Sequence, residues 1–209
     1  MMQERAARTR QALVCAAARE FDRNGYAASS LARITRSAGI SVGALTFHFA
    51  SKEDLAAEVR VHGHAATVAT VATVPRESEA VLWVISLTLS LASLLEEDVA
   101  VRAAARLTRE QPDGGPDWTS AWVPAIRERL GQLRQDEGLP GSARAALAAL
   151  ATHLLTGVEA EIRQLVSRDQ NPDGRPTARL ARIWDLIRQG LGVAQSDPGG
   201  AAPTPRRPR

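Results

Sequence analysis

Apolar residues recur at helical spacing in two short segments of the first quarter of the chain, and a turn separates them. Leu31 and Ile34 fall on one helix face, and Gly39 interrupts the pattern. A second short helix is then predicted over Val42–Phe47, with Ser41 able to cap its first turn. Glycine adopts a left-handed turn without a Cβ penalty. The pattern predicts a helix-turn-helix, and a purely structural helical corner shares this local signature.

Helical periodicity continues on both sides of this corner. A helix is predicted over residues 5–24, where Gly25 ends it, and residues 1–7 are expected to be a loose arm. Ser51 and Asp54 have the spacing of a capping box and start a helix that reaches about residue 66. The apolar pattern then predicts helices over residues 79–95, 99–109, 118 to about 138, 142–168 and 177–191.

These elements predict an all-α protein in three parts, because no segment alternates in the manner of a strand. Residues 1–52 form a three-helix domain with the helix-turn-helix. Residues 53–195 form a second, larger helical domain, and its helix over residues 142–168 carries many alanines that permit close helix packing. Residues 196–209 are rich in proline and glycine and are expected to be disordered.

Charge is distributed unevenly between these parts. Residues 1–52 hold eight basic and three acidic side chains, whereas the whole chain has a formal net charge of +3 and everything after residue 52 sums to −2. A positive field at this end suits contact with phosphates, where counterion release drives binding. The basic balance therefore supports DNA as the partner of the helix-turn-helix.

Cysteine content and hydropathy exclude several classes of protein. Cys15 is the single cysteine, so an intramolecular disulfide is excluded, and its place in the first helix predicts a buried structural thiol. No uninterrupted apolar run is long enough for a membrane span, and the N-terminus lacks the apolar core of a signal peptide. A cytoplasmic protein without a membrane partner is expected.

The candidate DNA contacts fall into two groups. Contacts to phosphate position a protein, whereas contacts to base edges specify sequence. Phe47 and Phe49 are expected to pack in the small core instead. The candidate phosphate and capping residues are Ser29, Ser30, Arg33, Arg36, Ser41, His48 and Lys52, and the candidate base readers are Val42, Gly43 and Thr46.

The N-terminal segments together resemble the DNA-binding domain of TetR-type transcriptional repressors. This resemblance implies a homodimer whose two recognition helices enter successive major grooves of a pseudo-palindromic operator. It also implies that residues 53–195 are the ligand-binding and dimerisation domain. The chain departs from the family at Val42, often a lysine, and at Thr46, usually a tyrosine, so weaker phosphate contacts or a different operator preference are expected. The segments that carry the resemblance are Phe21–Tyr26, Ile34, Ala38–Ser41, Gly43–Leu45, Phe47–Phe49 and Lys52–Leu55.

The second domain resembles more narrowly the γ-butyrolactone autoregulator receptors of actinomycetes, on Val101–Ala103, Arg106–Thr108, Trp122, Leu155–Glu159 and Leu180–Trp184. Such a receptor represses secondary-metabolite genes until a small lactone releases it from DNA. By this resemblance Trp122 walls the ligand pocket and Thr156 donates to a ligand oxygen. An ordinary core tryptophan and a threonine bonded to its own helix are the alternatives. The candidate ligand contacts are Trp83, Leu87, Trp118, Trp122, His153 and Thr156.

Other functions stay open at this point. Gly63 stands where these receptors often place a glutamine, which favours a pseudo-receptor that responds to antibiotics or their intermediates. A ligand-independent regulator, an activator and a helical adaptor without DNA binding are further alternatives. His62 and His64 do not share a helix face, so no metal site is expected. The chain lacks a phosphate loop, an HExxH pair and a nucleophile elbow, so neither an enzyme nor a cofactor is predicted.

Overall fold

The computed structural model describes residues 2–76, 79–111, 113–133, 140–168 and 174–191, which form helices joined by short connections and contain no strand. The prediction of an all-α protein is therefore confirmed for these residues. The elements are α1 (Met2–Ala28), α2 (Leu31–Ala38), α3 (Val42–His48), α4 (Lys52–Thr73), α5 (Ala80–Glu97), α6 (Val99–Glu110), the 3-10 helix η1 (Trp118–Ala121), α7 (Val123–Gly131), α8 (Gly141–Arg168) and α9 (Pro176–Leu191).

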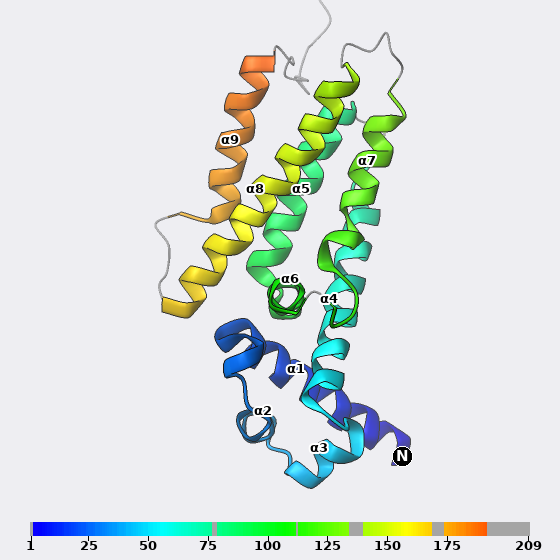
Figure 1. The fold of residues 1–209 in the computed structure, drawn as a ribbon, viewed down its shortest axis with the longest axis vertical. Coiled ribbons are helices and arrows are strands. Elements are labelled where there is room, and N and C mark those ends of the chain that lie inside the picture. The colour runs from blue at the N-terminus through cyan, green and yellow to red at the C-terminus, as the bar shows by residue number, and fades with distance from the viewer. Residues whose placement is uncertain (1, 77–78, 112, 134–139, 169–173, 192–209) are drawn as a thin grey trace, which may run out of the picture.

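The helices form two parts joined by α4 (Figure 1). We call α1–α3 the head, and α5–α9 with η1 the body. In the view of Figure 1 the head lies at the bottom, and α5, α7, α8 and α9 form a bundle above it. The helix α4 runs from the head upward along the body, and α6 lies end-on at the junction between the two parts.

The head is a compact helix-turn-helix built as the sequence predicts. Gly39 ends α2 in the left-handed conformation, with φ of 66°. The Ser41 hydroxyl then accepts a hydrogen bond from the Ala44 backbone N–H at 3.2 Å and caps α3. The head core also receives residues of α4 and α6. Its largest buried side chains are Leu13, Val14, Phe21, Ile34, Leu45, Phe49, Leu55, Val59 and Leu107.

Two expectations about the first helix are wrong. Residues 2–7 were expected to be a loose arm, but α1 begins at Met2 and includes them. Cys15 was expected to be buried, but it is exposed on α1 and accepts a contact from the Gln11 side chain. Its neighbours Val14 and Ala16 are buried in the head core, whereas Cys15 lies on the exposed face of α1.

The body encloses a second hydrophobic cluster around α5. Trp83, Leu87 and Leu91 of α5 are fully buried in this cluster, and α5 contacts α7, α8 and α9. By length and composition, α5 and α8 are apolar enough to cross a membrane, but more than half of the α5 segment is buried inside the body. A core helix of a bundle has this composition because its neighbours shield it on all sides.

The predicted helix that carries the tryptophans is divided in the structure. Residues 118–121 form the short η1, and α7 follows at Val123. Pro124 sits in the first turn of α7, where its missing N–H costs no helical hydrogen bond. Asp117 caps η1 by accepting from the Thr119 backbone N–H at 2.8 Å. The end predicted near residue 138 lies outside the described residues.

Polar contacts from one face of α6 fix the C-terminal end of α1. Arg102 Nε donates to the Asp22 carboxylate at 2.9 Å, and Arg106 Nη1 donates to the Asp22 carbonyl oxygen at 2.7 Å. Glu110 accepts from the Tyr26 backbone N–H at 2.6 Å. Burial raises the pKa of the Asp22 carboxyl above its ordinary value, and the Arg102 guanidinium opposes this shift. The head is thereby joined to α6 by a largely buried polar contact.

The boundary that we predict after residue 52 stays a prediction, because α4 contributes to both hydrophobic clusters. Leu55 and Val59 pack in the head core, whereas Val71 packs against the body core. The helix α4 extends to Thr73, beyond the predicted end near residue 66, and it stops before Pro75. The predicted disordered tail, residues 196–209, lies outside the described residues.

Candidate nucleic-acid interface and ligand-binding core

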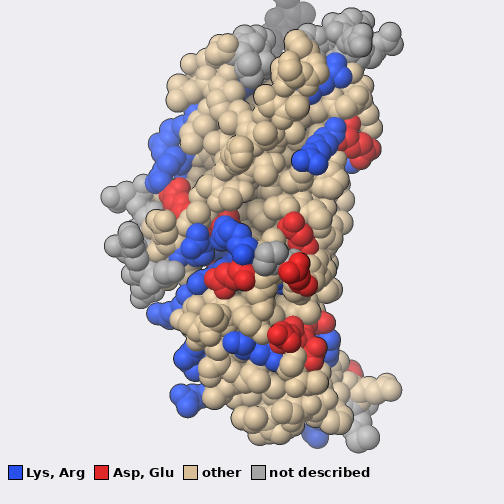
Figure 2. All heavy atoms as spheres, in the orientation of Figure 1, with Lys and Arg blue, Asp and Glu red and all other residues tan. Residues whose placement is uncertain are grey.

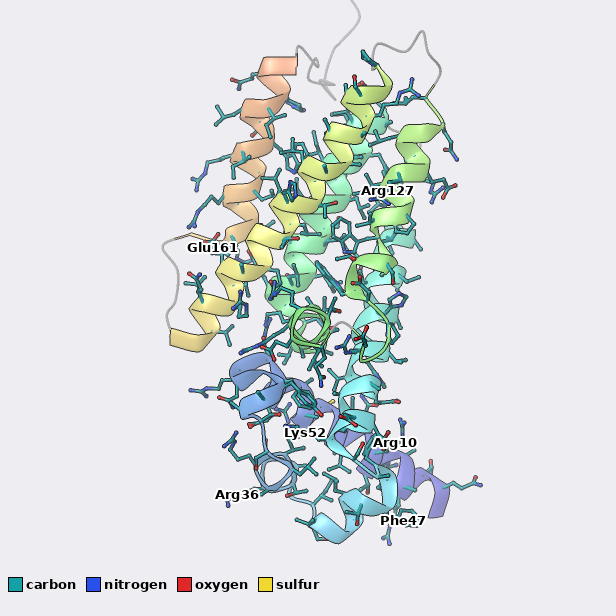
Figure 3. The ribbon with its side chains drawn as sticks, in the orientation of Figure 1. Arg10, Arg36, Phe47, Lys52, Arg127 and Glu161 are labelled. Carbon is teal, nitrogen blue, oxygen red and sulfur yellow. The ribbon has the colours of Figure 1, made fainter. Side chains whose placement is uncertain are left out.

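The outer surface of α3 is uncharged and open. Val42 is 55% exposed and Phe47 is 82% exposed, and Phe47 lies on the side of the head that faces away from the body (Figure 3). Nothing lies within 4 Å of the position that a Cβ on Gly43 would take. Thr46 is exposed, and its hydroxyl donates to the Gly43 carbonyl at 3.0 Å. This surface leaves room for a major groove to approach the helix backbone.

The expectation that Phe47 packs in the head core is wrong, whereas that for Phe49 is confirmed. Leu45 and Phe49 are both buried, and they lie four residues apart on one side of the chain. Phe47 lies two residues from each, so its side chain points to the opposite side. The spacing from Leu45 was the signal in the sequence that could have placed Phe47 on the surface.

The predicted phosphate contacts in and before α2 differ in whether their side chains already have partners within the protein. Ser30 caps α2 by accepting from the Arg33 backbone N–H, and Ser29 is buried and donates to the Tyr26 carbonyl at 2.6 Å. Arg33 Nε donates to Glu20 at 2.6 Å, so this guanidinium already has an acidic partner. Arg36 is exposed at the edge of the head (Figure 3). Geometry therefore favours Arg36 as a phosphate contact and a structural role for Ser29.

Lys52 is turned toward the interior of the head. Its Nζ donates to the Tyr26 carbonyl at 2.8 Å and to the Ser29 carbonyl at 3.3 Å, and it lies 4.2 Å from the centre of the Tyr26 ring. These contacts hold the end of α1 against the start of α4. His48 is half-buried, with its ring edge against Phe47. The phosphate contacts predicted for Lys52 and His48 stay predictions.

Basic side chains are spread over the head, while acidic ones gather near its junction with the body. Figure 2 shows Lys and Arg along one edge of the lower part and a largely uncharged lower tip. Acidic Glu53 and Asp54 of α4 share a groove of about 510 Å³ with Asp113. The uncharged tip suits direct contact with base edges, and the basic edge suits phosphates.

Four of the six predicted ligand contacts belong to the hydrophobic cluster of the body. Trp83 and Leu87 of α5 are fully buried, and Trp118 and Trp122 are buried in the same cluster. The rings of Trp118 and Trp122 have centroids 5.5 Å apart and are tilted by 59°. We call Trp118 and Trp122 the tryptophan pair. An apolar, aromatic environment of this kind suits a small organic ligand.

The indole N–H of Trp122 is buried and has no hydrogen-bond partner among the described residues. Buried indole N–H groups are normally bonded, so this donor is exceptional. The other three indoles each have an acceptor. Trp83 donates to the Val74 carbonyl at 3.5 Å, Trp118 donates to Thr67 Oγ1 at 3.0 Å, and Trp184 donates to Thr88 Oγ1 at 2.9 Å.

His153 and Thr156 do not join the tryptophan pair. Both are exposed on α8, because its buried stripe runs through Ala151, Leu155 and Val158. Thr156 donates to the carbonyl of Thr152, one turn earlier, at 2.8 Å, which is the alternative that the sequence left open. His153 lines a surface groove of about 670 Å³ between α7 and α8 instead.

Gly63 lies where α4 and α6 cross. A Cβ at this position would be 2.4 Å from the Ala104 Cβ and 2.7 Å from the Ala100 carbonyl oxygen. Only glycine fits such an approach without a shift of one helix. Close packing of α4 on α6 therefore explains why this position holds glycine instead of the glutamine often found in the receptors.

Comparison with known proteins places the chain in a family. Residues 13–59 match the model of the bacterial regulatory proteins of the tetR family. The A-factor receptor protein of Streptomyces griseus is 30% identical over 188 residues, covering 88% of this chain, and the chain spans 64% of that relative's length.

Two solved structures share most of the fold. A γ-butyrolactone receptor described as ArpA-like is 28% identical with a TM-score of 0.59, and the alignment covers 89% of this chain and 98% of that one. CprB from Streptomyces coelicolor, solved with its biological operator sequence, is 27% identical with a TM-score of 0.69, covering 88% and 89%. The chain belongs to the TetR family of bacterial regulatory proteins, in the group that includes γ-butyrolactone receptors.

Proposed function

We propose that this protein is a homodimeric, cytoplasmic repressor of transcription that a small molecule of the γ-butyrolactone class releases from operator DNA. By this proposal it controls secondary metabolism. Membership of the TetR family supports DNA binding by the head, and the relatives described as an A-factor receptor and a γ-butyrolactone receptor support the class of effector. The protein acts as a regulator in this account, with no chemical step and no cofactor.

The DNA-binding part rests on the surface of α3. Val42, Gly43, Thr46 and Phe47 are exposed there without a neighbouring element to cover them. An apolar side chain can contact a thymine methyl, and the small residues let the helix sit deep in the major groove. Arg36 supplies a phosphate contact from α2. Phe47 adds an apolar contact to base edges, whereas the phosphate contacts of the family's lysine and tyrosine have no counterpart at Val42 and Thr46.

The effector-binding part rests on one observation, the unpartnered indole N–H of Trp122 in the body core. A tryptophan that only fills the core would be expected to donate its indole N–H to an acceptor in the protein, as the other three tryptophans do. A lactone offers carbonyl and ring oxygens as acceptors, and Trp83 and Leu87 offer apolar surface to its remaining atoms. We therefore place the effector against Trp122.

The dimer rests on the outer faces of α8 and α9. Leu186 of α9 is 69% exposed and Ile183 is 36% exposed, although both are large and apolar. Ala145 and Ala149 are exposed on α8, and small residues allow helices to approach closely. We propose that these faces meet their two-fold mates in a four-helix interface.

A second candidate is a pseudo-receptor that responds to antibiotics or their intermediates. The crossing at Gly63 favours it, because the polar side chain often found there in receptors has no space here. The fold and the DNA-binding surface are the same in both candidates. They differ only in the class of effector.

Selection of bound fragments from genomic DNA, followed by a mobility-shift titration, tests the proposal. The selected site should be pseudo-palindromic, with half-sites about 34–36 Å apart. Addition of γ-butyrolactones should release the selected DNA from the protein. Release by antibiotics alone would select the pseudo-receptor, and failure to enrich any site would contradict DNA binding.

A further inference from the structure

Trp118 connects the tryptophan pair to the two helices that hold the head. Its backbone N–H donates to Thr108 Oγ1 of α6 at 3.0 Å, and its indole N–H donates to Thr67 Oγ1 of α4 at 3.0 Å. Trp118 and Thr67 are both buried. Trp118 is thus bonded to α4 through its side chain and to α6 through its backbone.

The hydroxyl of Thr67 carries this connection to the backbone of α4. An indole N–H can only donate, whereas a hydroxyl accepts and donates together. Thr67 Oγ1 accepts from Trp118 and donates to the Gly63 carbonyl at 2.7 Å. The chain of hydrogen bonds therefore ends at Gly63, where α4 lies so close to α6 that an added Cβ would clash with Ala104.

Below this point α4 is locked to α6 and, through α6, to the head. The Arg60 guanidinium is fully buried and donates to the Leu107 carbonyl at 2.5 Å and to the Gln111 carbonyl. Arg102 of α6 is bonded to Asp22 of α1. A displacement at Gly63 therefore moves a unit that includes α6 and the head, because these contacts hold its parts together.

We propose that Thr67 is the positioning residue through which the tryptophan pair sets the orientation of α4, and with it the separation of the two heads. This inference rests on the proposed function. An effector against Trp122 changes the tilt of the pair, and the Trp118–Thr67 hydrogen bond is kept in both arrangements, so that α4 follows the pair. A ligand shifts such an equilibrium only through contacts that differ between the two states.

The protein contains a matched control for this hydrogen bond. Trp184 of α9 donates its indole N–H to Thr88 Oγ1 of α5 at 2.9 Å, and both residues are buried. The chemistry and burial are the same as for Trp118 and Thr67, but neither α5 nor α9 belongs to the head or to α4. Thr67→Val and Thr88→Val each leave one buried indole N–H without an acceptor, so both variants lose stability for the same reason.

The first test compares effector binding with release of DNA. Effector binding is followed by tryptophan fluorescence with A-factor and other γ-butyrolactones, and release is followed by mobility shift. Thr67→Val should bind a lactone within about threefold of wild type but need about tenfold more for release, the range of a typical coupling between two sites. Thr88→Val should release as wild type does, and Thr67→Ser should restore release because it keeps the hydroxyl.

The second test needs no effector. Spin labels at Ser37→Cys, in a Cys15→Ser background that removes the exposed native thiol, report the distance between the two heads of a dimer. Thr67→Val should broaden this distance distribution, and Thr88→Val should leave it unchanged. If no lactone binds wild type or releases it from DNA, while Thr67→Val still broadens the distance distribution, the proposed effector class is wrong and the role of Thr67 stands.

Three results would overturn the role of Thr67. The first is a Thr67→Val variant that matches Thr88→Val both in release and in head separation. The second is equal broadening in both variants, which indicates general loosening. The third is loss of DNA binding by Thr67→Val without effector while Thr88→Val retains it, which indicates a structural role in the head.

Discussion

Arg102 Nε of α6 lies 2.9 Å from the Asp22 carboxylate of α1, and both side chains are largely buried at the junction of head and body. The same guanidinium donates through Nη1 to the carbonyls of Leu95 and Glu96 at the end of α5. One arginine therefore binds the head to the body core. This contact explains why α6, although it belongs to the body, contributes to the head core as well.

The Asp22 carboxyl should make stability depend on pH in a defined direction. Burial raises its pKa, so folding disfavours the charged form, and Arg102 only partly offsets this. The Asp22 carboxyl therefore contributes its full share to the free energy of unfolding below the ordinary aspartate pKa. This contribution is lost as pH rises through the raised pKa of the folded state. Urea unfolding from pH 4 to 7 should show the stability of wild type relative to Asp22→Asn falling with pH. A relative stability that rises with pH would contradict the assignment.

Phe47 and Phe49 should separate DNA binding from folding. Phe47→Ala should weaken operator binding with little change in unfolding free energy, because the side chain is 82% exposed. Phe49→Ala should cost about 3–5 kcal/mol of stability, as is typical for a buried phenylalanine. Mobility shift and thermal unfolding of both variants check this pair. Unchanged operator affinity in Phe47→Ala would remove it from the interface.

Gly63→Ala should strain the crossing of α4 and α6. The added Cβ would lie 2.4 Å from the Ala104 Cβ, and overpacking of this kind costs about 1–3 kcal/mol. Ala104→Gly in the same chain should restore part of the loss, but the contact with the Ala100 carbonyl stays. Denaturant unfolding of the two single variants and the double variant gives their coupling. Simple additivity would show that the two positions do not touch.

Leu186→Glu should convert the proposed dimer to a monomer, because it places a charge in the apolar face of α9. Val61→Glu is the control, since Val61 is also an exposed apolar residue but lies on α4. Sedimentation at micromolar concentration distinguishes the two variants. A dimer that survives Leu186→Glu would exclude this face as the interface.

Local signals in the sequence predicted the head well and the body only in part. Gly39 and Ser41 determine the corner through backbone geometry and capping, which neighbours in sequence decide. His153 and Thr156 were expected near the tryptophan pair, but the side of α8 that faces the core depends on packing against α5 and α7. The burial of Gly63 against Ala104 also depends on a contact between distant segments, so no local pattern shows it.

The most direct test of the account is an NMR titration of the four tryptophan indoles in ¹⁵N-labelled protein. Trp122→Phe assigns one indole N–H resonance, and Trp184→Phe assigns an indole that is already bonded to Thr88. A γ-butyrolactone that releases operator DNA should shift the Trp122 resonance downfield, because its N–H gains an acceptor, and should leave the Trp184 resonance in place. Release of the operator with an unchanged Trp122 resonance would contradict the effector site proposed for this protein.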